Sequence, residues 1–163
     1  MSNVRRLMRS PKLIVRRYPF EEPYHAHLEF EVDNGLFVGQ TDFYCNTRQI
    51  ADIGNGLIKF PQSIGDEYIF QNGSEDPKDN CYRFFLMRAY TIDLLGHCAL
   101  QFAMNANLQE PADGTCKFSI PADPAALNRL GESFREFAKL EHLELVWSPT
   151  ECDLHAEHRH TDA

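Results

Sequence analysis

Short segments in which apolar and polar residues alternate dominate this chain, and they constrain its fold more than any other feature. In the first of them Leu28, Phe30 and Val32 occupy every second position, the pattern of a strand with one buried face. The Asp-Asn-Gly sequence at 33–35 supplies a turn with residues that accept a positive φ, and a second alternating segment follows at 36–45. The two segments predict a β-hairpin.

Two longer, aromatic-rich segments, 81–92 and 97–106, flank an Asp-Leu-Leu-Gly turn and predict a second hairpin. Shorter strands are expected at 67–70, 116–120 and 143–147. Because the strands arrive as hairpins and not as alternating strand–helix–strand units, they favour an antiparallel sheet over a doubly wound parallel one.

Two segments have helical periodicity and begin with capping sequences. The first follows Asn46, which forms a capping-box sequence with Gln49, and it is expected to end at Pro61. The second begins at Asp123 and Pro124, with a side-chain acceptor at the N-cap and proline at the first helical position. Apolar residues recur at helical spacing in both: Ile50, Ile53, Leu57 and Phe60, and then Leu127, Leu130, Phe134 and Phe137.

Gly54 and Gly56 lie inside the first helix, where each costs about 1 kcal/mol relative to alanine. Packing must therefore hold this helix, and the small residues are expected to let it lie close to the sheet. The fold class predicted from these patterns is α+β: a single antiparallel, meander-like β-sheet packed with two amphipathic helices.

The charge of the chain is unevenly distributed. At 163 residues the chain has the size of one domain, and its formal net charge is −8. Six basic residues and no acidic ones lie in 1–17, and the remaining ten basic residues against 24 acidic residues give −14. We expect a basic, solvated or poorly ordered extension at 1–20, one α+β domain at 21–148, and a polar, His-bearing tail at 149–163.

An acidic body repels a phosphate backbone, so its charge predicts no nucleic-acid binding through the domain and favours a basic protein partner. No apolar run approaches the ~20 residues that span a bilayer, and no membrane contact is expected. The cysteines are widely spaced and form no C-x-x-C pair, and the N-terminus has no apolar signal core, so we expect free thiols and a cytoplasmic location. These cysteines are Cys45, Cys81, Cys98, Cys116 and Cys152.

The most suggestive candidate for chemistry is the pair Asp93 and His97, because an aspartate can orient a histidine for general-base work. Turn formation by Asp93 is the competing interpretation, since Gly96 closes the same turn. His25 and His27 share one face of a strand, but two ligands are too few for zinc. We therefore expect no metal site and no cofactor.

Four short sequences follow one another along the chain: the aromatic-Val-Gly-Gln-Thr-Asp-Phe strand at 37–43, the Leu-Ile-Lys-Phe-Pro helix end at 57–61, Asp93-x-x-Gly96-His97, and the strand and Asp-Pro-x-x-Leu helix at 118–130. In this order they resemble the WapI-type immunity proteins and the small bacterial proteins of unknown function grouped with them. The resemblance covers about residues 25–147. It implies a cytoplasmic, non-enzymatic inhibitor that binds the toxic domain of a contact-delivered toxin.

Three hypotheses about function remain open at this stage. The first is an immunity-type, protein-binding inhibitor whose acidic surface, including Glu75, Asp76 and Asp79, contacts a basic toxin domain. The second is a small-molecule enzyme that uses Asp93 and His97. The third is a structural module that forms homo-oligomers through a sheet edge.

Overall fold

The computed structural model describes residues 8–159, which form two antiparallel β-sheets and two α-helices. Sheet A has the strand order β3-β2-β1-β8-β9, and sheet B has the order β4-β5-β6-β7. Sheet A consists of β1 (Lys12–Tyr18), β2 (His25–Asp33), β3 (Val38–Asn46), β8 (Glu144–Trp147) and β9 (Cys152–His155). Sheet B consists of β4 (Glu67–Asn72), β5 (Phe84–Thr91), β6 (Cys98–Asn105) and β7 (Thr115–Ala122).

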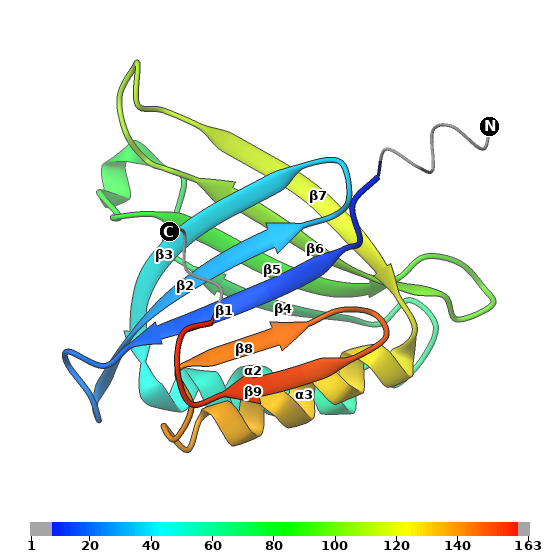
Figure 1. Ribbon diagram of the computed structural model, residues 1–163. Helices are drawn as coiled ribbons and strands as arrows, with labels where there is room; N and C mark the ends of the chain where they lie inside the picture. The colour runs from blue at the N-terminus through cyan, green and yellow to red at the C-terminus, as the bar shows by residue number, and fades with distance from the viewer. Residues whose placement is uncertain (1–7, 160–163) are drawn as a thin grey trace.

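The two sheets lie one behind the other, and helices α2 (Thr47–Lys59) and α3 (Pro124–Phe137) lie together along one side of both (Figure 1). A short 3-10 helix, η1 (Pro77–Asp79), interrupts the loop between β4 and β5. The predicted α+β class and the two helices are confirmed. The prediction of a single sheet is wrong, because the two hairpins belong to different sheets whose inner faces pack against each other.

Aromatic side chains join the two sheets. The ring of Phe85 on β5 lies 4.5 Å from that of Phe30 on β2 and 4.9 Å from that of Phe43 on β3, measured between centroids. All three side chains are buried. Alternation shows that one face of each hairpin is apolar, but it does not show whether that face packs on a helix or on a second sheet.

Two strands lie in segments expected to form the extension and the tail. β1 lies in the middle of sheet A, between β2 and β8, and β9 forms an edge of the same sheet. All residues from Leu13 to Arg17 are buried, so β1 shows no alternation of exposed and buried positions. Residues 1–7 and 160–163 of the expected extension and tail lie outside the described part of the chain.

Arg17 on β1 points toward the inside of the domain and is buried. Its guanidinium pairs with Glu22 and donates hydrogen bonds of 3.0 and 2.7 Å to the carbonyl of His142. The ring of Phe137 lies under the same group. Two of the six basic residues of 1–17, Arg16 and Arg17, are therefore buried parts of the sheet.

The helix starts predicted from the sequence are confirmed. Asn46 and Gln49 form a reciprocal capping box at α2. The Asp123 side chain accepts a 2.8 Å hydrogen bond from the Ala126 amide at α3, and Pro124 is the first residue of that helix. Both helices therefore begin where local side chains satisfy otherwise unpaired backbone amides.

The glycines of α2 serve two different contacts. Gly56 leaves room for the ring of Tyr68 from β4, so at this point α2 does lie close to a sheet. Gly54 faces α3, because a β-carbon added there would lie 2.7 Å from the carbonyl oxygen of Gly131. The two helix backbones meet at this pair of glycines.

Replacing Gly131 with alanine tests this helix contact. The new β-carbon would lie 2.8 Å from both the Gly54 carbonyl oxygen and the Ile58 amide nitrogen. We expect a loss of about 1 to 2 kcal/mol in the free energy of unfolding, because overpacking outweighs the better helix propensity of alanine. Urea unfolding measures it, with Gly114→Ala as the control, since no atom lies within 4 Å of that added carbon. Equal stability of the two variants would contradict the contact.

Candidate functional site

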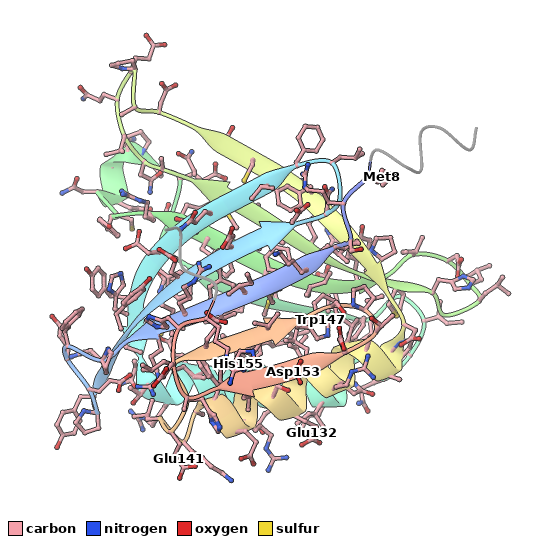
Figure 2. All side chains as sticks on the ribbon, in the orientation of Figure 1. Met8, Glu132, Glu141, Trp147, Asp153 and His155 are labelled. Carbon is pink, nitrogen blue, oxygen red and sulfur yellow. The ribbon has the colours of Figure 1, made fainter. Side chains whose placement is uncertain are left out.

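A row of ionisable side chains crosses all five strands of sheet A on the face that points away from sheet B. The strand registers align His155, Glu144, Arg16, Glu29 and Asp42, one from each strand in the order β9, β8, β1, β2, β3. His155 lies at the β9 end of this row (Figure 2). We call these five residues the charged row.

Arg16 is the centre of the charged row. Its two terminal nitrogens bond to Glu29 and to Glu31, the next outward residue of β2, at 2.8 Å each, and its Nε lies 3.8 Å from Glu144. Burial would lower the pKa of Arg16, but the hydrogen bonds to Glu31 and Glu29 outweigh it and raise that pKa. The guanidinium therefore stays charged and fixes the carboxylates around it.

A second row, made of rings, lies beside the charged row. Tyr18, His27 and Tyr44 face one another across β1, β2 and β3. The His27 ring stacks on Tyr44 with centroids 4.4 Å apart, and Tyr18 lies 5.2 Å from His27 on the other side. Tyr82, from the loop before β5, lies 5.7 Å beyond Tyr44. We call these four residues the aromatic row.

The aromatic row holds the carboxylate of Asp42 in place. His27 Nε2 lies 2.7 Å from Asp42 Oδ2, and the Tyr82 hydroxyl donates to the same oxygen at 3.0 Å. Burial and the hydrogen bond to Asp42 raise the pKa of Tyr82, so the phenol stays protonated and remains a donor. The hydroxyl of Tyr18 donates to Glu29 at 3.3 Å in the neighbouring position.

Glu29 and Asp42 are direct cross-strand partners, and both line one pocket of about 420 Å³. The ends of β6 and β7 also contribute to its lining, including Met104 and Cys116. Like charges placed opposite each other repel, so the surrounding donors are needed to keep both carboxylates here. The pocket has the size of an ordinary small-molecule site.

Arg83 also lines this pocket, and its guanidinium is held by backbone groups. One terminal nitrogen donates to the carbonyls of Tyr82 at 2.9 Å and of Ala106 at 3.1 Å. Its guanidinium carbon lies 4.1 Å above the Tyr82 ring. Arg83 therefore fastens the loop before β5 to the connection between β6 and β7.

The predicted partner-binding residues lie elsewhere, on the β4–β5 loop. Glu75 and Asp76 line a second pocket of about 410 Å³, and Asp79 is not among its lining residues. Glu75 accepts a hydrogen bond of 3.1 Å from Asn105, and Asp76 caps η1 by accepting from the Lys78 amide at 3.0 Å. The geometry gives Asp76 a role in ordering the loop.

The alternative pair, Asp93 and His97, does come together. His97 Nδ1 lies 2.6 Å from Asp93 Oδ2, and Asp93 Oδ1 accepts from the Leu95 and His97 amides. The hydrogen bond to His97 lowers the pKa of Asp93. The His97 side chain is 68% exposed at the tip of the β5–β6 hairpin. The pair stabilises this turn, and both residues also line an open pocket of about 480 Å³.

The nearest thiol to this pair is Cys98, which is buried and whose pKa burial raises. His25 is exposed and His27 is committed to Asp42. Among residues 8–159, no group of three His, Cys, Asp or Glu side chains could hold a metal ion.

The charged row was missed by sequence reasoning. The sequence did predict strands β2 and β3, and Glu29 and Asp42 occupy their polar, outward positions. Alternation along the strands was therefore a signal for the outward direction of these two side chains. The register that places these two side chains opposite each other was not available, and β1, which supplies Arg16, was not recognised as a strand.

Fold and site together define a two-sheet α+β domain with a polar pocket on its outer face. No protein-family model matches the chain, and no curated protein matches its sequence. Among solved structures, the chain is similar to the plant transcriptional regulator PBF-2, with a TM-score of 0.44 and 11% identity over 80% of this chain and 77% of that one. It is also similar to WHY1 from Arabidopsis thaliana, with a TM-score of 0.45 and 10% identity over 80% of this chain and 84% of that one.

These comparisons overturn the resemblance to the WapI-type immunity family, because the similar structures are not immunity proteins. The predicted neutralisation of a toxin domain is wrong. The basic toxin partner and the exclusion of nucleic acid are also overturned, since a transcriptional regulator is among the similar structures. The likeness itself concerns the arrangement of strands and helices.

Replacing Asp42 with asparagine tests the link between the two rows. Removing the negative charge should lower the pKa of Tyr82 toward its usual value, because Asp42 is one of the causes that raise it. A pH titration of the tyrosine ring carbons by NMR measures the change. Glu29→Gln is the matched control: it should lower mainly the pKa of Tyr18, which burial and Glu29 raise. An unchanged Tyr82 pKa in Asp42→Asn would show that the contact is absent in solution.

Proposed function

We propose that this protein is a non-enzymatic binding module that holds a small organic cation, carrying an ammonium or guanidinium group, in the pocket beside Glu29 and Asp42. The observation that carries the proposal is the cross-strand pair of carboxylates facing one pocket. Ammonium and guanidinium groups form their strongest hydrogen bonds with carboxylates.

The charge around the pocket favours a positive ligand. Glu29, Glu31 and Glu144 share the guanidinium of Arg16, so this part of the face keeps excess negative charge. Asp42 bonds to His27 and Tyr82, neither of which is an arginine or a lysine. Arg83 also lines the pocket, but its guanidinium donates to backbone carbonyls, and the two carboxylates outnumber it.

Both carboxylates are oriented before a ligand arrives. Arg16 and Tyr18 fix Glu29, while His27 and Tyr82 fix Asp42. A ligand then binds without the cost of ordering these side chains.

Met104 and Cys116 in the pocket lining suit the hydrocarbon part of an organic cation. Met104 is largely buried, and burial raises the pKa of the Cys116 thiol, so Cys116 is neutral and adds no charge. An alkyl chain can contact these two sulfur-bearing side chains while its charged end bonds to Glu29 and Asp42.

Binding without catalysis is supported by the state of the nucleophiles. Burial raises the pKa of Cys45 to about 12 and also raises that of Cys98, Cys116 and Cys152. The thiolate, which is the reactive form, is therefore scarce near neutral pH. All five cysteines are free thiols, which fits a protein that works in the reducing cytoplasm.

Calorimetric titration with agmatine and with butylamine, whose charged groups both carry N–H donors, tests the proposal. We expect at least one of these cations to bind, with an affinity that falls as the salt concentration rises. The cation recovered after binding should be chemically unchanged. Glu29→Gln and Asp42→Asn should each lower the affinity by roughly 10-fold to 100-fold, the loss expected when a hydrogen bond to a charged group is removed.

Glu31→Gln is the matched control, because Glu31 is the next outward residue of β2 but does not line the pocket. The affinity of this variant for the cation should lie within about threefold of that of the unchanged protein. Failure of both cations to bind would contradict the proposal. Tighter binding of a single-stranded oligonucleotide, weakened by the same two variants, would also contradict the proposal, because the ligand of the pocket would then be an anion.

A further inference from the structure

Sheet A has an open edge along part of β3. This strand pairs only with β2, and in residues 8–159 no strand covers its other side (Figure 1). In an antiparallel pair, alternate residues turn their backbone amide and carbonyl groups away from the neighbouring strand. The Asn34 amide donates to the Phe37 carbonyl at 3.1 Å, which fixes the alternation at the turn. Followed along the register from there, the outward backbone groups of β3 belong to Val38, Gln40, Asp42 and Tyr44.

The rest of the domain occupies only the far end of this edge. The Asn72 side chain donates to the Tyr44 carbonyl at 3.0 Å, which agrees with the outward direction of that group. The Tyr82 ring lies beside Tyr44 at the same end. Across the described residues, no hydrogen bond occupies the outward backbone groups of residues 38–42. We call residues 38–42 the open β3 edge.

The open β3 edge lacks the features that commonly block the addition of a strand. Edge strands of natural sheets are often very short, or they carry lysine or proline. Two other edges of this domain show such features, since β9 has four residues and β7 contains Lys117 and Pro121. β3 has nine residues, none of them lysine or proline, and its register with β2 runs without a bulge. The strand is therefore able to accept a further strand.

The pocket beside Glu29 and Asp42 opens at this edge. Its lining includes Thr41, which is buried and paired with the inward-facing Phe30, as well as Asp42 on the outward face of β3. A pocket that touches both faces of an edge strand extends around the edge itself. A strand added here would lie at the pocket, and its residue opposite Asp42 would point to the same face as Asp42 and Glu29.

We propose that the open β3 edge binds an extended peptide as an additional antiparallel strand, with an arginine or lysine of the peptide opposite Asp42. This inference rests on the proposed function, and it identifies the organic cation as a side chain of that peptide. The peptide backbone bonds to the outward groups of Val38, Gln40 and Asp42. These main-chain hydrogen bonds supply affinity, while Asp42 and Glu29 select a basic side chain, which continues the charged row by one strand.

A basic peptide fits this edge better than a second copy of the chain does. β3 carries Asp42 and contains no lysine or arginine. Pairing of two β3 strands would therefore add another carboxylate to the face that already holds Glu29 and Asp42, and it would bring no cation. Like charges on neighbouring strands are destabilising, whereas opposite charges stabilise the pair. The charge at the end of the charged row thus favours a basic partner.

Calorimetric titration of the full chain with the peptide Thr-Arg-Thr-Val-Thr-Val, acetylated and amidated at its ends, tests the proposal. The peptide should bind at least about tenfold more tightly than agmatine, which carries the guanidinium group without a peptide backbone. Asp42→Asn should lower the affinity for this peptide roughly tenfold. The same variant should change by less than about threefold the affinity for the peptide that has glutamine in place of arginine, because that peptide has no charge to pair with Asp42.

N-methylation of the peptide separates backbone pairing from side-chain binding, and it leaves the protein unchanged. With the arginine opposite Asp42, the amide of the first valine faces Gln40 and bonds to β3, while the amide of the second threonine points away from β3. Methylating the valine amide should lower the affinity roughly tenfold. Methylating the threonine amide is the matched control and should change the affinity by less than about threefold.

The results distinguish this inference from the proposed function. If agmatine binds but the peptide binds no more tightly, or if the two methylated peptides bind equally well, strand addition is overturned and the cation pocket stands. If neither agmatine, butylamine nor the peptide binds, the proposed function is overturned as well. Sedimentation velocity measures the size of the free protein, and a dimer that does not bind the peptide would also overturn strand addition by a peptide.

Discussion

Three carboxylates from two strands converge on the guanidinium of Arg16 in the middle of sheet A. Glu144 is fully buried among them, so loss of this guanidinium would leave negative charge where water cannot solvate it. Removing one partner of a buried ion pair costs about 3 to 5 kcal/mol. The outer face of sheet A, including the position of Glu29 at the pocket, therefore depends on Arg16.

The same strands build the core and the pocket. On β2 and β3, Phe30 and Phe43 point inward to Phe85, while their chain neighbours Glu29 and Asp42 point outward to the pocket. Because side chains alternate along a strand, one backbone register fixes both sets. The packing of the phenylalanines thus keeps the two carboxylates opposite each other.

Much of the secondary structure could be predicted from the sequence, because alternation, helical spacing and capping residues are local signals. The capping box at Asn46 and the Asp123–Pro124 helix start are examples that the structure confirms. The division into two sheets could not be predicted, since an apolar face looks the same whether a helix or a sheet covers it. β1 was missed because both of its faces are buried, and with it Arg16 and the centre of the charged row.

The alternation of β2 and β3 also restricts how this pocket can change during evolution. A one-residue insertion within either strand would turn its phenylalanine outward and its carboxylate inward, and both core and pocket would be lost together. The connection between β6 and β7, which contributes Ala106 and Gly114 to the pocket lining, carries no such restriction. Homologous pockets are therefore free to diverge through the length of that connection, while their strand residues change only by substitution.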